Sequence, residues 1–225
     1  MAKPTKPKAA EPAWRRVYAH VRAQIVAGDI PPGRFLEEEV VSAEVGVSRT
    51  PVREAFQRLH AERFIDRLPR RGAIVRAATA EELVQLYETR RVIESFVVCR
   101  IAEQGIAVPA ALDTLVARMA VPRKATDLSF QAEGDFTLHR SLVGLVGNAV
   151  MLDMFDALHL RQLRVAMRAV ALNPGRLALV HSQHMALLEA LRRRDGDAAV
   201  AILNEHLKPA PEILARMDIG DESRS

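Results

Sequence analysis

The sequence predicts a mainly helical protein, with an N-terminal winged helix-turn-helix followed by an all-helical antiparallel bundle. Its 225 residues leave room for two small domains, each with its own core. Strand-like segments occur only around residues 64–76, and from residue 79 onward the apolar residues recur at helical spacing. We therefore expect these parts in order: a disordered arm at 1–12, the winged helix-turn-helix at 13–76, a linker at 77–80, the helical domain at 81–218 and a disordered tail at 219–225.

The composition is that of an ordinary globular protein, with 49% hydrophobic and 27% charged residues. The longest apolar stretches, such as 142–152, fall well short of the roughly 20 residues that span a bilayer. The lysines near the N-terminus precede no apolar segment, so a secretory signal is not expected, and the single Cys99 cannot form an internal disulfide. These features predict a soluble cytoplasmic protein with no membrane partner.

Charge is distributed unevenly along the chain. Residues 1–80 contain 15 Lys and Arg against 9 Asp and Glu, whereas residues 81–225 contain 17 against 19. A basic first third joined to a slightly acidic remainder indicates a module that binds a polyanion, attached to a neutral partner domain.

The first third contains three helical segments in succession. Apolar residues predict an amphipathic helix over 14–27, which Gly28 and the Pro31-Pro32-Gly33 turn then end. A short helix fits 37–45, ended by Gly46. The third helix follows Ser48, which is placed to cap it, with Pro51 tolerated in its first turn.

The third helix has two chemically different faces. The inward face repeats at helical spacing and consists of Val52, Ala55, Phe56 and Leu59. The other face carries Arg49, Arg53 and Gln57 at steps of four residues, with Thr50 beside them. Arginine can bridge O6 and N7 of guanine, and hydroxyl groups at a helix N-terminus bind phosphate, so this face suits the DNA major groove.

Two short strand-like segments, 64–67 and 73–76, follow the third helix. The segment between them, Leu68-Pro69-Arg70-Arg71-Gly72, predicts a hairpin with a basic tip that ends in glycine. Together with the three helices, this hairpin predicts a winged helix-turn-helix whose wing lies along the minor groove.

The run GVSRTPVREAFQRLHAERF followed by PRRGAIV resembles the DNA-binding domain of GntR-family transcription regulators. The resemblance covers residues 21–75 and implies a set of DNA-contacting residues: Ser48, Arg49, Thr50 and Arg53 from the helix, and Arg71 and Gly72 from the wing. The sequence departs from the family pattern at Phe56, where leucine is more usual, and at Arg63, where glycine is common. Both departures fall on the packing or turn side.

Beyond residue 79 we expect six helices, at roughly 80–104, 109–120, 127–146, 149–171, 175–194 and 196–217. Asp135 and His139, four residues apart, share one apolar helix stripe, and His184 and His206 lie on inward stripes of two later helices. Polar groups buried in this way need a partner, and a divalent cation would supply one. His181, one turn before His184, competes with it on this reasoning alone.

Residues 80–217 resemble the FCD domain, the helical effector domain of the FadR subgroup of GntR regulators. The matching segments are LYETRRVIE at 86–94, residues 135–148, residues 184–199 and His206-Leu207. Many FCD domains bind a metal through one aspartate and three histidines. The positions that match are Asp135, His139, His184 and His206, which favours His184 over His181. The resemblance implies a divalent ion, with zinc as first choice and nickel or manganese as alternatives.

A metal with four protein ligands keeps coordination positions that a small carboxylate can fill. Arg90 lies on an inward stripe and is a candidate for binding this acid, although Glu94, one turn on, is an alternative partner for it. Asn148 is a second candidate, with a helix C-cap as the competing interpretation, and Arg164 is a third.

These features predict a non-enzymatic transcription regulator that binds a palindromic operator as a homodimer and responds to a small organic acid. Repression is favoured over activation. Two alternatives remain open: a sensor for which the metal itself is the signal, and a metalloenzyme with an appended DNA-binding domain. No second carboxylate at general-base spacing accompanies the four metal ligands, which argues against the enzyme.

Overall fold

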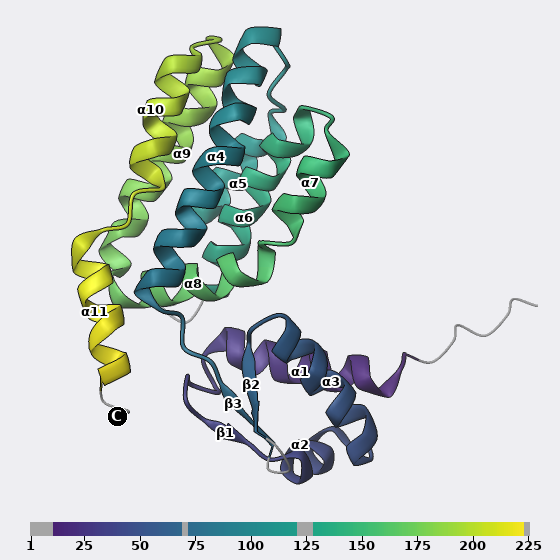
Figure 1. Ribbon diagram of the computed structural model, residues 1–225. Helices are drawn as coiled ribbons and strands as arrows, with labels where there is room; N and C mark the ends of the chain where they lie inside the picture. The colour runs from purple at the N-terminus through teal and green to yellow at the C-terminus, as the bar shows by residue number, and fades with distance from the viewer. Residues whose placement is uncertain (1–10, 69–71, 121–127, 223–225) are drawn as a thin grey trace, which may run out of the picture. The chain divides into compact units, whose positions relative to one another are not determined.

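The computed structural model of the protein describes residues 11–68, 72–120 and 128–222. The chain divides into two compact units between Ala77 and Ala78 (Figure 1). In the described ranges, no helix combines the length and the apolar character needed to cross a membrane.

The N-terminal unit consists of three helices and a small antiparallel sheet (Figure 1). Its elements are, in order, α1 (Ala13–Ala27), β1 (Phe35–Leu36), α2 (Glu38–Val45), α3 (Arg49–Ala61), β2 (Ile65–Leu68) and β3 (Gly72–Val75). The strand order is β1-β3-β2, and Ile65 of β2 pairs with Val75 of β3. The winged helix-turn-helix is therefore confirmed, with β1 as an additional strand that the sequence pattern did not predict.

The helices of this unit pack through apolar residues at helical spacing. The predicted inward face of α3 is confirmed, because its four apolar residues are all buried. They pack in a core with residues of α1 and the sheet, among them Val17, Val21, Phe64, Ile65 and Val75. Gly28 and Gly46 end α1 and α2 in the left-handed conformation, as expected for helix C-caps.

The turn between α3 and β2 contains a strained position. Arg63 has φ of 61°, a left-handed conformation that side chains with a Cβ adopt at a cost. This is the position at which the GntR pattern commonly has glycine. The arginine found here therefore places a residue with a Cβ in a conformation that glycine adopts without steric cost.

The C-terminal unit is a helical bundle (Figure 1). Its elements are α4 (Ala80–Gln104), α5 (Ala111–Ala120), α6 (Leu128–Leu145), α7 (Ala149–Asp156), α8 (His159–Leu172), the 3-10 turn η1 (Pro174–Arg176), α9 (Leu177–Arg192), α10 (Gly196–His206) and α11 (Pro211–Glu222). The 25-residue α4 runs the length of the bundle and contacts α6, α8, α9 and α10, so its side chains reach most of the core.

The prediction of six helices was wrong in two places. The segment 149–171 forms two helices, α7 and α8, with a bend at 157–158 that contains neither glycine nor proline. Phe155 and Leu163, on either side of this bend, are both fully buried. The segment 196–217 also forms two helices, because Pro209 and Pro211 cannot donate the backbone hydrogen bonds that a continuous helix needs.

Candidate functional site

The exposed face of α3 carries the predicted DNA-contacting residues. Ser48, Arg49, Thr50 and Arg53 are all exposed, on the side of the helix opposite its apolar residues. Ser48 occupies the N-cap position, as expected, but its side chain makes no capping hydrogen bond. The first turn of α3 thus presents hydroxyl groups, guanidinium groups and free backbone N–H groups on one surface.

Two carboxylates of α2 hold the arginines of this face. Arg53 Nε donates to Glu38 Oε2 at 2.7 Å, and the guanidinium of Arg49 donates to Glu39. Both arginine side chains are more than half exposed. Ion pairs in such surroundings contribute about 1 kcal/mol or less, so DNA phosphates or bases can replace the carboxylates at small cost.

The wing is described only in part, and Arg71 lies outside the described residues. Gly72 begins β3 with φ of 129°, and a Cβ at this position would overlap the carbonyl oxygen of Leu36 in β1. Close approach of two strands therefore requires glycine here, and a DNA contact from Gly72 stays a prediction.

In the C-terminal unit, the structure brings the four predicted metal ligands together. One ligand atom from each of Asp135, His139, His184 and His206 lies within 4.8 Å of the other three. They come from α6, α9 and α10, and the three histidines are buried. The centre of the group is Asp135 Oδ1, which lies 3.2 Å from His184 Nε2, 3.5 Å from His206 Nε2 and 3.7 Å from His139 Nε2.

The second oxygen of Asp135 is held by neighbouring side chains. Gln162 Nε2 donates to Asp135 Oδ2 at 2.9 Å, and Arg90 Nη1 donates to the same atom at 3.2 Å. Burial raises the pKa of this carboxyl, but the positive charge of Arg90 and the hydrogen bonds made by neighbouring side chains outweigh burial and hold the pKa well below its usual range. Asp135 is therefore an ionised candidate ligand with one oxygen directed at the histidines.

Hydrogen bonds at the far nitrogens orient two of the imidazoles. His139 Nδ1 contacts the carboxylate of Glu94, and His206 Nδ1 lies 3.2 Å from Gln183 Oε1. Because these partners accept hydrogen bonds, each Nδ1 is placed to donate, and each Nε2 lies on the side of the ring that faces the cluster. Burial lowers the pKa of His184 and lowers that of His206 to about 3, so both imidazoles are neutral near pH 7.

This donor set fits a divalent metal ion. Ligand atoms about 2.1 Å from one ion lie about 3.0 Å apart at right angles and about 3.4 Å apart at tetrahedral angles. The separations of 3.2 and 3.5 Å from Asp135 Oδ1 to His184 and His206, and of 3.3 Å between Nε2 of His139 and Nε2 of His184, are close to this range, whereas the 3.7 Å from Asp135 Oδ1 to His139 is longer. A carboxylate with imidazole nitrogens suits zinc, nickel or manganese.

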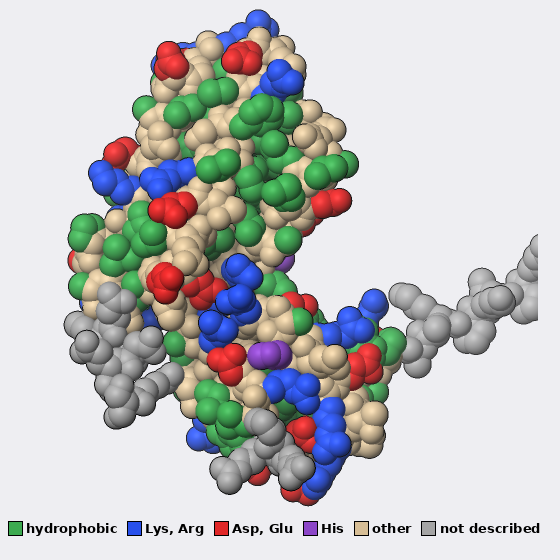
Figure 2. Space-filling view, in the orientation of Figure 1, with side chains coloured by type: hydrophobic (Ala, Val, Ile, Leu, Met, Phe, Trp, Pro, Cys, Tyr) green, Lys and Arg blue, Asp and Glu red, His purple; other side chains and the backbone are tan. Residues whose placement is uncertain are grey.

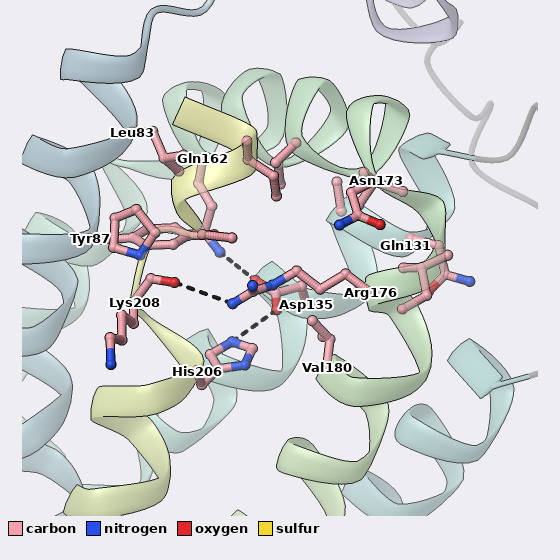
Figure 3. Close-up of a pocket in the computed structure, with 18 of the residues that line it drawn as sticks. Leu83, Tyr87, Gln131, Asp135, Gln162, Asn173, Arg176, Val180, His206 and Lys208 are labelled. Atoms are coloured by element: carbon pink, nitrogen blue, oxygen red, sulfur yellow. Dashed lines mark hydrogen bonds and ion pairs between the residues drawn. The ribbon is translucent and has the colours of Figure 1, made fainter. Parts of the chain in front are cut away.

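A pocket lies beside the cluster (Figure 3), with a volume of about 800 Å³ that includes space open to solvent. Asp135, His206 and Arg90 form part of its wall, so the candidate metal centre and a cationic side chain face one cavity. Most of the remaining wall is apolar and comes from α4, α8, α9 and the segment around α11. A mostly apolar wall with a few polar groups is typical of sites for small organic molecules.

The other residues named from the sequence lie outside the four-residue cluster. His181 does not belong to the cluster, so the geometry selects His184. Asn148 caps the N-terminus of α7, where its Oδ1 accepts from the Met151 N–H, and it is not on the described pocket wall. The competing interpretation as a C-cap was therefore wrong, and effector binding by Asn148 stays a prediction. Arg164 forms a buried ion pair with Glu82 of α4.

The pairing of Arg90 with Glu94 was foreseen, and Arg90 Nε donates to Glu94 Oε1 at 2.6 Å. Sequence reasoning missed that Glu94 also contacts His139, that Gln162 holds Asp135, and that Arg176 lines the pocket. The contacts of Glu94 with His139 and of Gln162 with Asp135 join helices that are far apart in the sequence. The run LYETRRVIE, which includes Glu94, was the only signal that could have indicated one of them.

A winged helix-turn-helix joined to a helical domain with a ligand-sized pocket is the architecture of a DNA-binding transcription regulator. Residues 14–75 match the family described as bacterial regulatory proteins, gntR family, and residues 85–209 match the FCD domain. The chain belongs to the GntR family and carries an FCD domain, as the sequence motifs indicated.

Individual relatives agree with this assignment. The chain is 28% identical to the gluconate operon transcriptional repressor of Bacillus licheniformis, over 85% of this chain and 80% of that protein. It is 30% identical to the HTH-type transcriptional repressor RspR of Escherichia coli strain K12, over 90% and 89% of the two chains. A crystal structure of a GntR transcriptional regulator from Rhodococcus sp. RHA1 superposes with a TM-score of 0.67 at 26% identity, covering 92% of this chain and 97% of that one.

Proposed function

We propose that this protein is a cytoplasmic repressor that binds a palindromic operator as a homodimer and is released by a small organic acid. The acid binds in the FCD domain, at a divalent metal held by Asp135, His139, His184 and His206. The observation that carries this proposal is that Asp135 and His206 of the four-residue cluster line the same pocket as Arg90.

The chain's own residues supply the selectivity for an acid. When bound, the metal supplies coordination positions for a carboxylate oxygen. Arg90 places guanidinium N–H donors on the same wall, and Glu94 together with Asp135 holds its guanidinium in position. Burial raises the pKa of the Tyr87 hydroxyl on this wall, so Tyr87 remains a neutral hydrogen-bond donor. These groups favour an anion and disfavour a cation.

Exposed apolar residues on α4 and α7 support the dimer. Val92 and Phe96 lie one turn apart on α4 with 76% and 47% of their surface exposed, and Val150 and Met154 lie one turn apart on α7 with 71% and 57% exposed. Figure 2 shows hydrophobic side chains gathered on this face of the bundle. An apolar patch of this kind is typical of a protein interface, and a two-fold dimer suits a palindromic operator.

Helix α4 connects the pocket to the segment that joins the two units. It begins at Ala80, shortly after the boundary at Ala77, and it carries Leu83, Tyr87 and Arg90 on the pocket wall. An acid that binds two arrangements of α4 with different affinity would shift the population of the DNA-binding form. Repression is the direction we propose, because two relatives bear the name of repressor.

The test is operator binding by the full-length, metal-loaded protein in the presence of a panel of small carboxylic acids. We expect an acid that weakens operator binding by wild type by about 5- to 150-fold, the usual range of allosteric coupling. The variant His139→Ala should bind the operator but no longer respond to that acid. Release of the variant by the same acid would contradict a metal-linked effector site.

The presence of the pocket also favours a regulator that responds to an acid over a sensor for which the metal alone is the signal. A pure ion sensor needs no cavity beyond its ligands, whereas here an apolar-walled pocket extends from the cluster past Arg90. Operator binding that follows metal loading and ignores every acid would favour the ion sensor instead.

A further inference from the structure

Arg176 gives the pocket a second cationic group, apart from the metal ligands. It ends the 3-10 turn η1, and its side chain extends across the pocket, where Nη2 donates to the backbone carbonyl of Lys208 at 3.2 Å (Figure 3). Among the described residues no carboxylate lies within ion-pair distance of its guanidinium. A guanidinium has five N–H donors, so most of those of Arg176 remain available to a ligand.

Arg176 differs in this respect from the other arginine of the pocket. Arg90 is buried against two carboxylates, Glu94 and Asp135, which neutralise its charge. Arg176 is only partly buried, and the one polar contact that it makes among the described residues is with a neutral carbonyl. Its positive charge is therefore uncompensated, and an anionic ligand group would compensate it.

The pocket wall near the candidate metal ligands contains two side chains with an unpaired polar atom. Arg90 Nη2 and Gln162 Oε1 are buried and have no hydrogen-bond partner among the described residues. Gln162 uses its amide nitrogen on Asp135, so its free atom is the acceptor oxygen. This end of the pocket thus offers one donor and one acceptor, which a carboxylate oxygen and a neighbouring hydroxyl group satisfy together.

Apart from these groups and the polar side chains of Tyr87, Gln131 and Asn173, most of the pocket wall is apolar. Leu83, Ala166, Ala169, Val180 and Ile213 contribute side chains that cannot hydrogen-bond. A ligand with hydroxyl groups on every carbon would leave several of them unsatisfied against this wall. The apolar wall therefore favours a ligand with polar ends and a hydrocarbon middle.

We propose that Arg176 is a second anion subsite, and that the effector is an acyclic 2-hydroxy acid with a further acidic group at its other end. This inference rests on the proposed function, because it places the first carboxylate at the metal-ligand end of the same pocket. The further acidic group is a carboxylate or a phosphate, both of which a guanidinium binds.

A matched pair of acids tests this subsite by calorimetric titration of the metal-loaded, full-length protein. 2-Hydroxyglutarate and 2-hydroxypentanoate share a five-carbon chain and differ in the terminal carboxylate. We expect wild type to bind the diacid about 10- to 100-fold more tightly, the size of a charge-assisted hydrogen bond. Arg176→Gln should reduce this preference to about twofold or less, and Arg176→Lys should keep a large part of it.

Arg216 provides the matched control. It also donates to a backbone carbonyl, that of Leu172, but it is exposed and not on the described pocket wall. Arg216→Gln should therefore keep the full preference for the diacid. If Arg176 only fastens the backbone near Lys208, Arg176→Gln will weaken both acids equally, and the subsite is overturned.

The remaining outcomes separate this inference from the proposed function. Equal binding of both acids to wild type, with loss of both in His139→Ala, overturns the second subsite and leaves the metal-linked acid site standing. Binding of neither acid contradicts both. A comparison of 3-phosphoglycerate with glycerate identifies the source of the second anion, because a preference for the phosphate compound that Arg176→Gln abolishes shows that phosphate is accepted.

Discussion

Both units of this protein pair arginine with glutamate, but in different surroundings. In the winged helix-turn-helix, Arg49 and Arg53 contact Glu39 and Glu38 at the surface, with both guanidinium groups more than half exposed. In the helical unit, Arg90 contacts Glu94 and Asp135 with 2% of its side chain exposed. The same two residue types therefore form exchangeable pairs between α2 and α3 and a fixed framework around Arg90.

The difference follows from the solvent around each pair. Water screens the exposed pairs, so each contributes about 1 kcal/mol or less and can give way to DNA. Removing one partner of a buried pair leaves an uncompensated charge, which costs about 3–5 kcal/mol. Evidence that the two sets respond alike to substitution would break this comparison.

The largest effect is expected for Asp135→Ala. This change removes a candidate metal ligand and leaves Arg90 Nη1 and Gln162 Nε2 without their acceptor in the core, so we expect loss of bound metal and a loss of about 1–3 kcal/mol in the free energy of unfolding for each unsatisfied donor. Asp156, which accepts two hydrogen bonds from Arg140 at the surface, is the matched control. Asp156→Ala should cost about 1 kcal/mol or less in chemical denaturation. Equal losses would contradict the buried framework.

The next effect concerns DNA. Arg49→Ala should reduce the affinity for the operator by about 5- to 150-fold, the size of one base contact, and leave the unfolding midpoint unchanged. Arg58 lies on the same helix, with its guanidinium 3.8 Å from the centre of the Trp14 ring. Arg58→Ala should lower stability and keep the operator affinity. Gel-shift titration checks both, and wild-type affinity in Arg49→Ala would refute the DNA-facing assignment.

A smaller effect tests the orientation of His139. Glu94→Gln keeps the shape of the side chain and removes the charge that accepts from His139 Nδ1. We expect the metal affinity to fall by about 10- to 100-fold, measured by competition with a chromogenic chelator. Glu189→Gln changes an exposed glutamate of α9 that pairs with Arg193, and it should leave metal affinity unaltered.

The smallest expected effect is the gain in stability when an arginine in a left-handed conformation is replaced by glycine. Arg63 and Arg194 both adopt left-handed conformations, with φ of 61° and 58°. Arg63→Gly should stabilise the N-terminal unit by about 1 kcal/mol, because glycine adopts this conformation without steric cost. Arg194 packs its guanidinium against Gly105, so Arg194→Gly loses a contact and should gain less. Thermal unfolding of the two variants compares them directly.

The sequence predicted those features that repeat along one element. The inward and outward faces of α3 follow from apolar residues three and four positions apart, and the inward positions of Asp135, His139, His184 and His206 follow from the same rule. The helix ends at Gly28, Gly46 and Gly105 were also predicted, but the break between α10 and α11 was missed although Pro209 and Pro211 are visible in the sequence. The bend at 157–158 and the two-residue β1 carry no such residue or repeat, so the pattern could not show them.

Contacts between distant helices were beyond the sequence pattern. Glu94 and His139 are 45 residues apart, and Gln162 and Asp135 are 27 apart. Their meeting depends on the axial register of neighbouring helices, which the apolar spacing within one helix does not specify. Asn148 shows the opposite case, because a polar residue after Gly147 matched both a ligand group and a cap until the structure placed it at the start of α7.

The most direct test of the account is the metal content of the purified full-length protein, measured by elemental analysis after incubation with zinc, nickel or manganese and removal of free ion. The account predicts about one divalent ion per chain in wild type and none in the double variant His139→Ala/His184→Ala. Absence of bound metal in wild type under all three conditions, or equal content in the double variant, would contradict it.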